Sequence, residues 1–535
     1  MRLNSLIPGA TALAFATPLI AAPTYSNATT VSQFVSQLDL SQQDAKDVTA
    51  VFGSYQTSEQ IASLDEKTRA TMACSVSQIV FSSIYLNATS TNYQDRIDVN
   101  WSDACWLDAQ CIVQPTAAAD VAKALFIISF MDTRFAVRSG GHNPNPEFAS
   151  VGDNGILIDN VNLNEITLIE DGAVARVGPG NRFGAVLKTL SEENKTVVGG
   201  RIEDVGVGGY YLGGGMAYFS SEYGLAADGI RNIEIVLANS SIVNANATSN
   251  SDLFWALKGG GANFGVVTRY DINTIPVAEI WFEALLYDPS ESEKLLEAVV
   301  EYAAAAENDT AAGLVFNLTP DAGLVGFIYG KPVERPSVYK SFDGIPSNGV
   351  YVNSTIGTWL DLADGFANTT SLTASRYMIV SIAHKWNLPT FQDSYQTYLN
   401  LSAQVMKEFN ATLAYGVQPY TSAAVKHSAK TGGNPLGLEP IGQNWFTSTI
   451  QWQDESNDEQ ALAAIQALGD SVISASKKHG ADLPFRFMND ANHAQNVLAS
   501  YGSANLERLR SISKQYDPQQ MFQNLQNGGF LLSKA

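Results

Sequence analysis

"CIVQPTAAADVAKALFIISFMDTRFAVRSGGHNPNPEF" (residues 111–148) reads as an apolar strand, an amphipathic helix and a second strand that ends in glycines. The first strand meets Pro115, and Thr116 can cap the helix with Asp120 in its early turns. One face of this helix carries Val121, Leu125 and Ile128. Residues 135–138 supply the second strand. The stretch therefore predicts a β-α-β unit whose second strand feeds a glycine loop.

His142 follows Gly140 and Gly141 directly and is itself followed by two prolines. A histidine that packs in a core does not need this setting, because the glycines leave the backbone almost bare. Glycine also lets backbone N–H groups approach a ligand closely. His142 is therefore the first candidate for contact with a ligand.

The composition is that of a globular chain with room for two or three domains. Of 535 residues, 45% are apolar and 16% are charged, which separates the chain from disordered sequences. The net charge is −21. Because a field of this sign repels nucleic acids and acidic lipid surfaces, we expect neither nucleic acid nor a membrane as a partner.

The N-terminus has the pattern of a secretory signal peptide over residues 1–22. Arg2 supplies a positive charge, Leu6 to Ile20 are mostly apolar or small, and Ala21-Ala22 offers a cleavage zone. Two prolines shorten the apolar run too much for a membrane span. The alternative is an ordinary buried N-terminal segment.

Twelve Asn-x-Ser/Thr acceptors favour the signal peptide and a secreted glycoprotein. They are Asn27, Asn87, Asn100, Asn194, Asn239, Asn246, Asn308, Asn317, Asn353, Asn368, Asn400 and Asn410. The three cysteines, Cys74, Cys105 and Cys111, allow one disulfide bond and leave one thiol, and their spacing does not select the pair. We expect no metal site, because no histidine lies near the cysteines and the five histidines are far apart in sequence.

Changes in composition predict four segments after the signal peptide. They are a partly helical lead-in (23–104), a turn-rich α+β unit (105–278), a second domain of longer helices and isolated strands (279–484), and a C-terminal segment (485–535). Within them we expect strands at 155–160, 173–180 and 264–273, a hairpin at 232–245, and a short helix that Asp252 caps. Longer helices are expected at 293–308 and 505–516, with strands at 375–384 and 444–453.

Glycine is concentrated at Gly140-Gly141, at 205–215 and at 259–267. Several such loops in one domain can cradle a pyrophosphate without lysine or arginine, whereas one loop alone is more often a tight turn. The G-x-G-x-x-G fingerprint of a Rossmann fold is missing from residues 130–280. The sequence therefore favours an anionic cofactor held in another kind of fold.

Four motifs in order resemble the flavin oxidoreductases related to berberine bridge enzyme, in the vanillyl-alcohol-oxidase-type superfamily. They are VRSGGH (137–142), VGVGGYYLGGGMAYFSSEYGLAADGIRNIEIV (205–236), DLFWALKGGGANFGVVT (252–268) and YDPQQMFQ (516–523). The likeness covers 110–275 and 485–532, with GGNPLGL (432–438) between them. It implies an α+β fold. In this fold a PCMH-type FAD-binding domain of two α/β subdomains joins a substrate domain with an antiparallel sheet covered by helices.

The resemblance implies FAD bound covalently through His142, by a bond to the 8α-methyl group. Many relatives carry a second link from a cysteine, but Ile202 stands at that place, so we expect a single bond. The family also implies a Cys74–Cys111 disulfide with Cys105 unpaired. The other residues that would surround the cofactor are Arg138, Ser139, Gly140, Gly141, Asn143, Asp204, Val205, Gly206, Val207, Gly208, Gly209, Gly213, Gly214, Gly215, Asn263, Gly265, Val267 and Asn524.

Two residues are candidates for catalysis. Oxidation by flavin needs a proton acceptor near the carbon that loses hydride. Asp490 in FRFMNDANHAQ stands where many relatives have a tyrosine, and it can act as a base or cap the helix expected after it. Tyr420 is the second candidate, and Asn434 and Trp452 are candidates for the pocket wall, each with a core or turn role as the alternative.

These observations predict a secreted, monomeric FAD-linked oxidase. An alcohol, a sugar or a biosynthetic intermediate would pass hydride to the flavin, and O2 would reoxidise it to give H2O2. Val207 is small enough to let oxygen in, and the missing tyrosine counts against a sugar. The alternatives are a flavin dehydrogenase with another acceptor and a secreted binding protein that kept only the fold.

Overall fold

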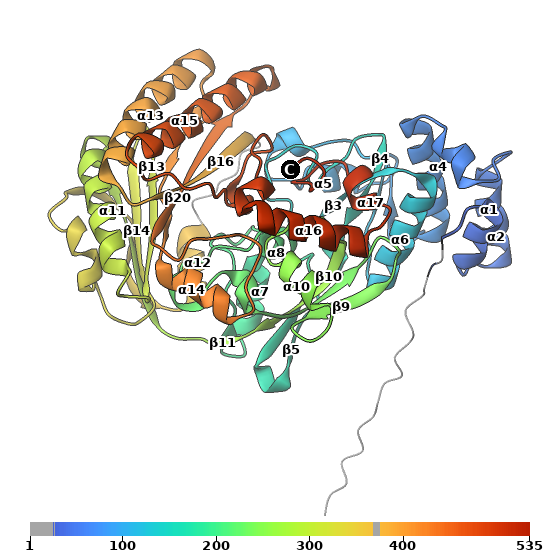
Figure 1. Ribbon diagram of the computed structural model, residues 1–535, viewed down its shortest axis with the longest axis horizontal. Coiled ribbons are helices and arrows are strands. Elements are labelled where there is room, and N and C mark those ends of the chain that lie inside the picture. Colours follow the sequence, from blue (N-terminus) through green and yellow to red (C-terminus); the bar gives the residue numbers. More distant parts are fainter. Residues whose placement is uncertain (1–24, 26, 368–374) are drawn as a thin grey trace, which may run out of the picture.

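The computed structural model describes Tyr25 and residues 27–367 and 375–535. The predicted signal peptide (1–22) and the acceptor Asn368 lie outside these residues. The described chain forms two lobes (Figure 1). One has a four-stranded, a five-stranded and a short two-stranded sheet together with the terminal helices, and the other has a single large sheet. Among the described residues, no helix combines the length and the apolar character that a membrane crossing needs.

Four helices precede the first sheet, as the helical spacing of the lead-in predicts. They are α1 (Val31–Gln37), α2 (Gln42–Val51), α3 (Ser58–Ala62) and α4 (Glu66–Val80). Each begins after a polar residue whose side-chain oxygen accepts a backbone N–H. Phe34 of α1 stacks on Phe126 and Phe130 of α6 (Ala118–Met131) at 5.1 and 4.2 Å. The lead-in therefore covers the helix of the β-α-β unit.

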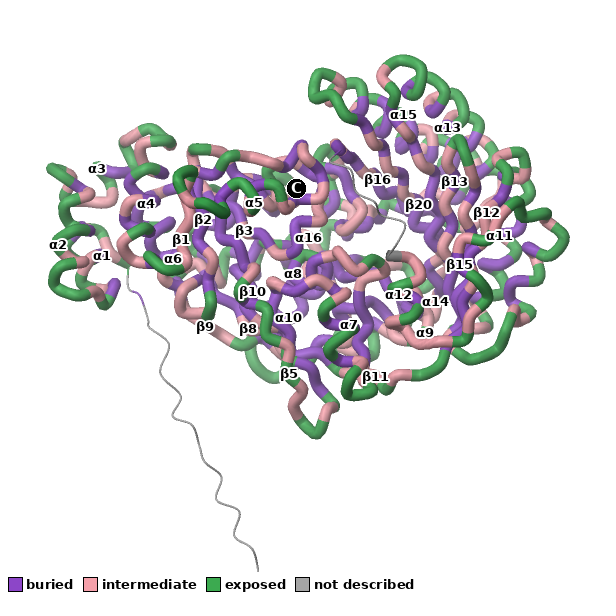
Figure 2. The backbone as a smooth tube through the Cα atoms, turned by 180° about the vertical axis from the view of Figure 1, so that it is seen from behind, coloured by how far each residue is buried: buried purple, intermediate pink, exposed green. Residues whose placement is uncertain are grey.

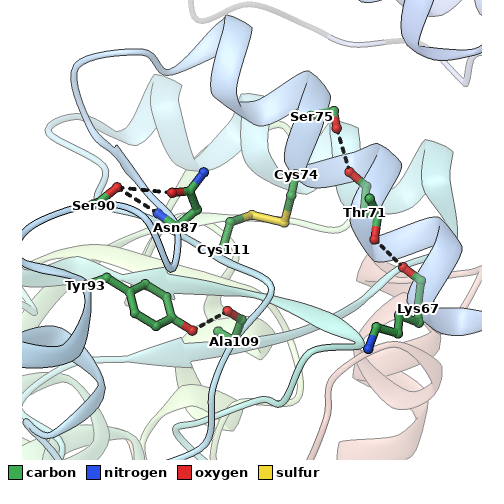
Figure 3. The surroundings of a disulfide bond; sticks show 9 residues. All are labelled: Lys67, Thr71, Cys74, Ser75, Asn87, Ser90, Tyr93, Ala109 and Cys111. Carbon is green, nitrogen blue, oxygen red and sulfur yellow. Dashed lines mark hydrogen bonds between the residues drawn. A yellow bond between two sulfur atoms is a disulfide. The ribbon is translucent and has the colours of Figure 1, made fainter.

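A disulfide bond joins Cys74 of α4 to Cys111, the pair that the family resemblance implies (Figure 3). Cys111 begins strand β2 (Cys111–Val113), so the bond ties the helical lead-in to the first sheet. Such a cross-link stabilises the fold chiefly by restricting the unfolded chain. Cys105 is buried and unpaired.

The first sheet has the strand order β1-β2-β4-β3, with β3 and β2 both parallel to β4. Its other strands are β1 (Tyr85–Leu86), β3 (Arg134–Arg138) and β4 (Gly155–Asp159). The β2-α6-β3 unit confirms the predicted β-α-β, and β4 lies between its two strands. Thr116 is not the N-cap. Ala117 occupies that place, and the Asp120 carboxylate accepts the N–H groups of Thr116 and Ala117 at 2.9 and 3.1 Å.

The second sheet is antiparallel, with the order β5-β6-β10-β8-β9. Its strands are β5 (Ile166–Ile169), β6 (Val174–Val177), β10 (Val266–Asn273), β8 (Ile230–Val236) and β9 (Ile242–Asn246). The predicted β8-β9 hairpin and the predicted strands at β4, β6 and β10 are confirmed. Asp252 does not cap the short helix α10 (Ser251–Leu257), whose N-cap is Asn250; its carboxylate accepts the Tyr516 hydroxyl at 2.8 Å instead.

Short elements connect this lobe. They are α5 (Tyr93–Ile97), α7 (Phe183–Ser191), β7 (Lys195–Thr196), α8 (Val207–Leu212), α9 (Ser220–Tyr223) and β11 (Ile275–Pro276). One core of apolar side chains packs α7, α8 and α10 against the second sheet. The same core includes Leu436, Trp445 and Phe487, which come from later in the chain. The glycine-rich segment of α8 therefore lies at the boundary between the lobes.

The nine-stranded sheet of the second lobe has antiparallel pairing in the order β15-β12-β14-β13-β18-β20-β16, with β17 and β19 also on β20. Its strands are β12 (Ile280–Tyr287), β13 (Ala312–Leu318), β14 (Gly323–Tyr329), β15 (Ser347–Gly357), β16 (Arg376–Lys385), β17 (Thr412–Leu413), β18 (Tyr415–Gly416), β19 (Pro419–Tyr420) and β20 (Gln443–Trp452). The expected strands at 375–384 and 444–453 are confirmed as β16 and β20.

Long helices cover the outer face of this sheet (Figure 1). They are α11 (Ser292–Ala306), α13 (Leu388–Phe409) and α15 (Asp458–Lys478), and the shorter α12 (Trp359–Ala367) and α14 (Ser422–Lys430) lie toward the first lobe. Figure 2 shows buried backbone along β16 and β20 and exposed backbone on the outer helices. The opposite face of the sheet is thus turned toward the glycine loops.

The last segment returns to the first lobe (Figure 1). Its helices are α16 (Ser503–Tyr516), which confirms the expected helix at 505–516, and α17 (Met521–Asn524). Gln526 then pairs with Phe135 of β3, and the Asn527 N–H donates to the Phe135 carbonyl at 2.7 Å. The C-terminal segment therefore pairs in parallel alongside the strand that leads to His142.

Candidate functional site

Strand β3 ends in a buried ion pair that fixes the start of the glycine loop. Arg138 and Asp159 are almost fully buried, and the Arg138 guanidinium lies 2.9 Å from the Asp159 carboxylate. Arg96 also reaches this carboxylate, at 2.7 Å. A buried carboxylate with two guanidinium partners keeps its charge compensated. The Arg138 side chain therefore stabilises the end of β3 through this ion pair, and only the Arg138 backbone continues into the glycine loop.

The first and second glycine loops touch through their backbones. A Cβ at Gly140 would lie 2.5 Å from the Gly206 Cα, and a Cβ at Gly206 would meet the Gly140 backbone in the same way. Ser139 ties the two loops together, because its hydroxyl donates to the Pro179 carbonyl and accepts the Gly208 N–H at 3.0 Å. Only glycine at both positions permits this approach. The structure thus brings the sequence-predicted residues Ser139, Gly140, Gly206 and Gly208 together. We call this contact the glycine cradle.

Four backbone N–H groups at this contact have no hydrogen-bond acceptor among the described residues: those of Gly140, Gly141, His142 and Gly206. Gly141 has φ +74°, the left-handed conformation that turns successive N–H groups toward one side. Backbone N–H groups that converge in this way bind anions. This part of the site fits the diphosphate of a dinucleotide cofactor without a basic side chain.

His142 presents an unused imidazole at the tip of the loop. In the described part of the chain, neither ring nitrogen has a hydrogen-bond partner, and the ring is half-buried. It stacks face to face on Trp101 at 4.7 Å and 9°. Burial lowers the pKa of His142 to about 4, against a smaller raising effect from Asp204 and a further lowering by Arg182. The imidazole is therefore neutral at pH 7, with a nitrogen lone pair available.

The second glycine loop is braced from the C-terminal segment. Asn489 donates to the Gly209 carbonyl at 3.2 Å and accepts the Gly215 N–H at 3.1 Å. A Cβ at Gly213 would collide with the Asn489 side chain. Gly214 has φ +101° and lies against Leu436 of the GGNPLGL segment. These glycines hold α8 close to residues that arrive from the other lobe.

The third glycine loop supports the second one. The Gly261 N–H donates to the Leu212 carbonyl at 3.0 Å. A Cβ at Gly265 would lie 2.5 Å from the Val236 carbonyl oxygen, so this glycine permits close packing on β8. Val267 is buried in the same core as Val207. The third loop is thus joined to the cradle through Leu212.

The Asn263 side chain is fully occupied inside the protein. Its amide nitrogen donates to the Gly260 and Phe530 carbonyls at 2.8 and 2.9 Å. Its oxygen accepts from Gln523 Nε2 at 3.0 Å and from the Leu532 N–H at 3.1 Å. Asn263 therefore fastens the returning C-terminal segment, and its side chain has no donor or acceptor left for a cofactor.

Asn524 lies away from the glycine cradle. It is exposed, and its carbonyl accepts from Arg134 Nη1 at 2.7 Å at the opposite end of β3 from Arg138. The structure does not bring this residue to His142. Asn527, three residues later, donates from its side chain to the Ser150 carbonyl at 3.1 Å. The C-terminal segment therefore approaches the loop region after Asn524.

The remaining cofactor candidates flank the cradle. Asn143 closes a turn by accepting the Asn145 N–H at 2.9 Å, and Asp204 forms an ion pair with Arg182 at 3.0 Å. Arg182 also donates to the Gly140 carbonyl at 2.9 Å. Val207 is buried in the core, with Val205 packed against it. Ile202, which stands where relatives have a second cysteine link, is exposed.

Asp490 contacts one residue from each lobe. Its carboxylate accepts from Gln418 Nε2 at 2.8 Å and lies 4.0 Å from the Arg201 guanidinium. Burial raises the pKa of Asp490, and Arg201 and Gln418 offset part of that rise. The alternative role as a helix cap is wrong, because residues 491–497 form no helix. A buried carboxyl group beside one arginine has the character of a proton acceptor.

Tyr420 is a poor candidate for proton transfer. It is buried, it stacks on Trp445 at 4.1 Å, and its hydroxyl has no partner among the described residues. Burial raises the pKa of Tyr420 well above its ordinary value of 10.0. Trp452 is a core residue whose indole N–H donates to Asp458 at 3.0 Å, and Asn434 closes a turn by accepting the Leu436 N–H at 3.1 Å. For these last two the core and turn alternatives hold.

Sequence reasoning missed several residues that shape the site: Trp101, Arg182, Arg201, Gln418 and Asn489. Asn489 could have been found, because it directly precedes Asp490 in the same motif. The others lie outside every motif and reach the site only through tertiary packing. Among the described residues, no group of side chains is arranged to hold a metal ion.

Two family models match the chain at the segments that build this site. The FAD binding domain matches residues 109–246, and the model described as berberine and berberine like matches residues 487–527. The first contains the glycine cradle and His142, and the second contains Asn489 and Asp490. The free N–H groups and the neutral imidazole are the parts of the site that fit FAD.

Curated relatives align over most of the chain. An FAD-dependent monooxygenase of Arthrobotrys oligospora is 36% identical over 471 residues, which cover 86% of this chain and 90% of the relative. An FAD-dependent monooxygenase of Aspergillus niger is 37% identical, over 84% of this chain and 77% of the relative. The bifunctional solanapyrone synthase of Alternaria solani is 30% identical, over 79% of this chain and 81% of the relative.

Solved structures share the fold at low identity. Xylooligosaccharide oxidase from Myceliophthora thermophila matches with a TM-score of 0.71 at 18% identity, covering 87% of this chain and 99% of that one. 6-Hydroxy-D-nicotine oxidase from Arthrobacter nicotinovorans matches with a TM-score of 0.69 at 20% identity, covering 83% of this chain and 97% of that one. With the curated relatives, these findings confirm the expected fold class and the expected enzyme class. The chain belongs to the berberine bridge enzyme-like family of FAD-linked oxidoreductases.

Proposed function

We propose that the protein is a secreted oxidase that acts on a small organic molecule, holds FAD covalently through His142 and passes electrons to O2, giving H2O2. The observation that carries this proposal is the neutral, unpaired imidazole of His142 beside the Gly140–Gly206 contact. A protonated histidine, or one whose unprotonated nitrogen accepts a hydrogen bond, would have no free lone pair for a bond to carbon. The covalent link is single, because Ile202 offers no second nucleophile.

The backbone around His142 binds and orients the cofactor. The N–H groups of Gly140, Gly141 and Gly206 would hold the diphosphate, and the His142 nitrogen would bond to the 8α-methyl carbon. Covalent attachment would need a two-electron oxidant, because one hydrogen would leave the methyl carbon and one would leave the imidazole. O2 would take up both hydrogens as H2O2. The hydrophobic packing of Val207 and its neighbours keeps water from the buried side of the loop.

Asp490 accepts the proton that the substrate releases. FAD, when bound, supplies the acceptor for the substrate's two electrons. Gln418 fixes one carboxylate oxygen at 2.8 Å, and the positive charge of Arg201 at 4.0 Å offsets part of the rise that burial causes in the pKa of Asp490. Removal of a general base of this kind lowers a rate by about 10²–10⁴-fold.

The covalent link is tested on the purified protein. After denaturation in acid or detergent, flavin absorbance and mass should stay with the wild-type chain, and the His142→Ala variant should release the flavin. Wild-type flavin that separates freely from the denatured chain would refute the covalent link. Peroxide production with sugars, alcohols and phenolic compounds then identifies the substrate class; the missing tyrosine favours the last two over sugars.

Oxygen insertion is a second candidate, because relatives with 36% and 37% identity are named FAD-dependent monooxygenases. The two reactions differ in the fate of oxygen. An oxidase sends both atoms of O2 into H2O2, whereas a monooxygenase places one of them in the product. Reaction under ¹⁸O2 followed by mass spectrometry of the product decides between them, and label in the organic product would overturn the oxidase.

Secretion is supported by the disulfide bond and by the exposure of most acceptor asparagines. The exposed acceptors are Asn27, Asn194, Asn239, Asn308, Asn353, Asn400 and Asn410. Asn100 is buried and its amide donates to the Cys105 carbonyl at 2.9 Å, so this site should stay unmodified. Glycopeptide mass spectrometry of protein from the culture medium tests both statements. We further propose a monomer with no nucleic-acid or membrane partner, in keeping with a net charge of −21.

A further inference from the structure

Three aromatic rings form a continuous stack across the boundary between the lobes. Trp101 lies flat on His142 at 4.7 Å and 9° on one side. The same indole also stacks on Tyr377, at 4.2 Å and 16°. His142 comes from the glycine loop, Tyr377 from β16 of the nine-stranded sheet, and Trp101 from the segment before the first glycine loop. The indole therefore contacts one ring from each lobe.

The backbone around Trp101 is fastened on both sides of the stack. The backbone N–H of Trp101 donates to the Gly141 carbonyl at 2.8 Å. On the other side, the Tyr377 N–H donates to the Ser102 hydroxyl at 3.0 Å, and the Asp103 N–H donates to the Ser375 carbonyl at 3.1 Å. The backbone that carries the indole is thus held by the same hydrogen bonds that join the glycine loop to β16.

The ring face of Trp101, and not its N–H, makes the contact. Its Nε1 is buried and has no partner among the described residues. Other tryptophans with a donating indole are Trp106, Trp281, Trp445 and Trp452. A buried N–H without an acceptor destabilises a fold, so the site tolerates Trp101 for the flat surface that it offers. An aromatic ring without the N–H should serve as well.

We propose that Trp101 is a positioning residue for cofactor attachment, because its stacked indole holds the His142 imidazole in one plane and shields one face of it from water. The inference rests on the proposed covalent link. The charged groups that face His142 are Asp204 and Arg182, which pair with each other at 3.0 Å and so largely cancel. Removal of the indole would free the imidazole to rotate and let water reach it.

The experiment measures the covalent attachment of flavin separately from the binding of FAD. The full-length chain is produced with limited riboflavin, FAD is added, and the rate at which flavin becomes resistant to denaturation is measured for wild type and variants. Loss of orientation at a reacting atom costs about 10²-fold, and we expect Trp101→Ala to slow attachment by that order while still binding FAD. Trp101→Phe should remain within about threefold of wild type, because a ring with the same plane retains the orientation.

A second measurement does not depend on the covalent bond. The His142 imidazole is titrated by NMR in flavin-free chains, and Trp101→Ala should raise its pKa from about 4 toward the ordinary 6.5, whereas Trp101→Phe should not. Trp386→Ala is the matched control, because Trp386 is also half-buried in a ring stack, on Phe391 at 5.7 Å, but far from the loop.

The outcomes separate the two proposals. Slow attachment and a raised pKa in Trp101→Ala, with both restored in Trp101→Phe, support the positioning role of Trp101. Wild-type attachment in Trp101→Ala, or a Trp101→Phe variant as slow as Trp101→Ala, overturns it. If the wild type forms no covalent bond, the proposed link fails, and the titration alone then decides whether Trp101 shields His142.

Discussion

The two lobes each hold a histidine whose pKa burial lowers to about 4, yet the two are built differently. His384 lies in β16 and uses both ring nitrogens. Nδ1 donates to the Lys385 carbonyl at 2.9 Å, and Nε2 accepts from the Asn444 amide at 2.9 Å. His142 lies on a glycine loop, and neither of its nitrogens has a partner among the described residues.

The difference teaches that a low pKa does not by itself identify a functional histidine. Both imidazoles are neutral at pH 7, but only His142 keeps a lone pair that no group of the protein uses. The pairing of β16 with β20 places Asn444 opposite His384, and the other partner is the carbonyl of the next residue, Lys385. The glycine loop offers His142 no such partners, because the two residues before it are glycines and the Asn143 side chain is used in a turn. The free lone pair, together with the bare backbone, marks the site.

The largest expected effect comes from replacing each of these two histidines by alanine. His142→Ala should fold normally and carry no covalent flavin. His384→Ala should keep covalent flavin but lower the free energy of unfolding by about 2–4 kcal/mol, because it leaves buried polar groups of Asn444 and Lys385 unpaired and opens a cavity. Flavin content after denaturation and urea unfolding measure the two effects. If His384→Ala lost the covalent flavin while folded, the comparison would fail.

Asp490→Asn tests the next largest effect. We expect the turnover rate to fall by about 10²–10⁴-fold, because the amide cannot accept the proton, while flavin content stays at the wild-type level. Because burial raises the pKa of Asp490 above the ordinary 3.8, the wild-type rate should decline on acidification at a pH above that value. Stopped-flow measurement of flavin reduction across pH checks both. Unchanged reduction in Asp490→Asn would assign the proton to another acceptor.

Local patterns predict much of the fold. The β-α-β unit, the β8-β9 hairpin and the strands β16 and β20 follow from periodicity, because in each the buried face repeats along a short stretch. The helix starts at Thr116 and Asp252 were wrong by one or two residues, since several polar side chains compete to cap each helix.

The site was less predictable where it depends on tertiary contacts. Glycines at 140, 206 and 208 predict that two loops approach closely through their backbones, and the structure shows this contact. No local signal places Trp101 on His142 or Gln418 on Asp490, because these pairs come from segments far apart in the sequence. Asn263 lies in a glycine motif, yet it holds the C-terminal segment, which only the hydrogen bonds reveal.

Acid should destabilise the scaffold through His384. Its folded pKa of about 4 lies below the ordinary 6.5 of the unfolded chain, so the unfolded state binds more protons between these values. The stabilising contribution is complete above pH 6.5 and is lost as pH falls toward 4, up to about 3 kcal/mol for a fully buried group. His384→Gln removes the titration, and urea unfolding at neutral and acidic pH should then show a smaller pH dependence than in wild type. An equal dependence would mean that other groups control acid unfolding.

The smallest expected effect compares two serine hydroxyls, one in each region. Ser139 joins the glycine loops through Pro179 and Gly208, whereas Ser448 of β20 donates only to the Ala414 carbonyl at 2.5 Å. Each alanine substitution should lower the free energy of unfolding by about 1–3 kcal/mol, with Ser139→Ala the larger because two groups lose a partner. Only Ser139→Ala should also slow covalent flavin attachment, since it loosens the contact that orients His142. Equal attachment rates in both variants would show that the contact between Gly140 and Gly206 holds the loop without the hydroxyl.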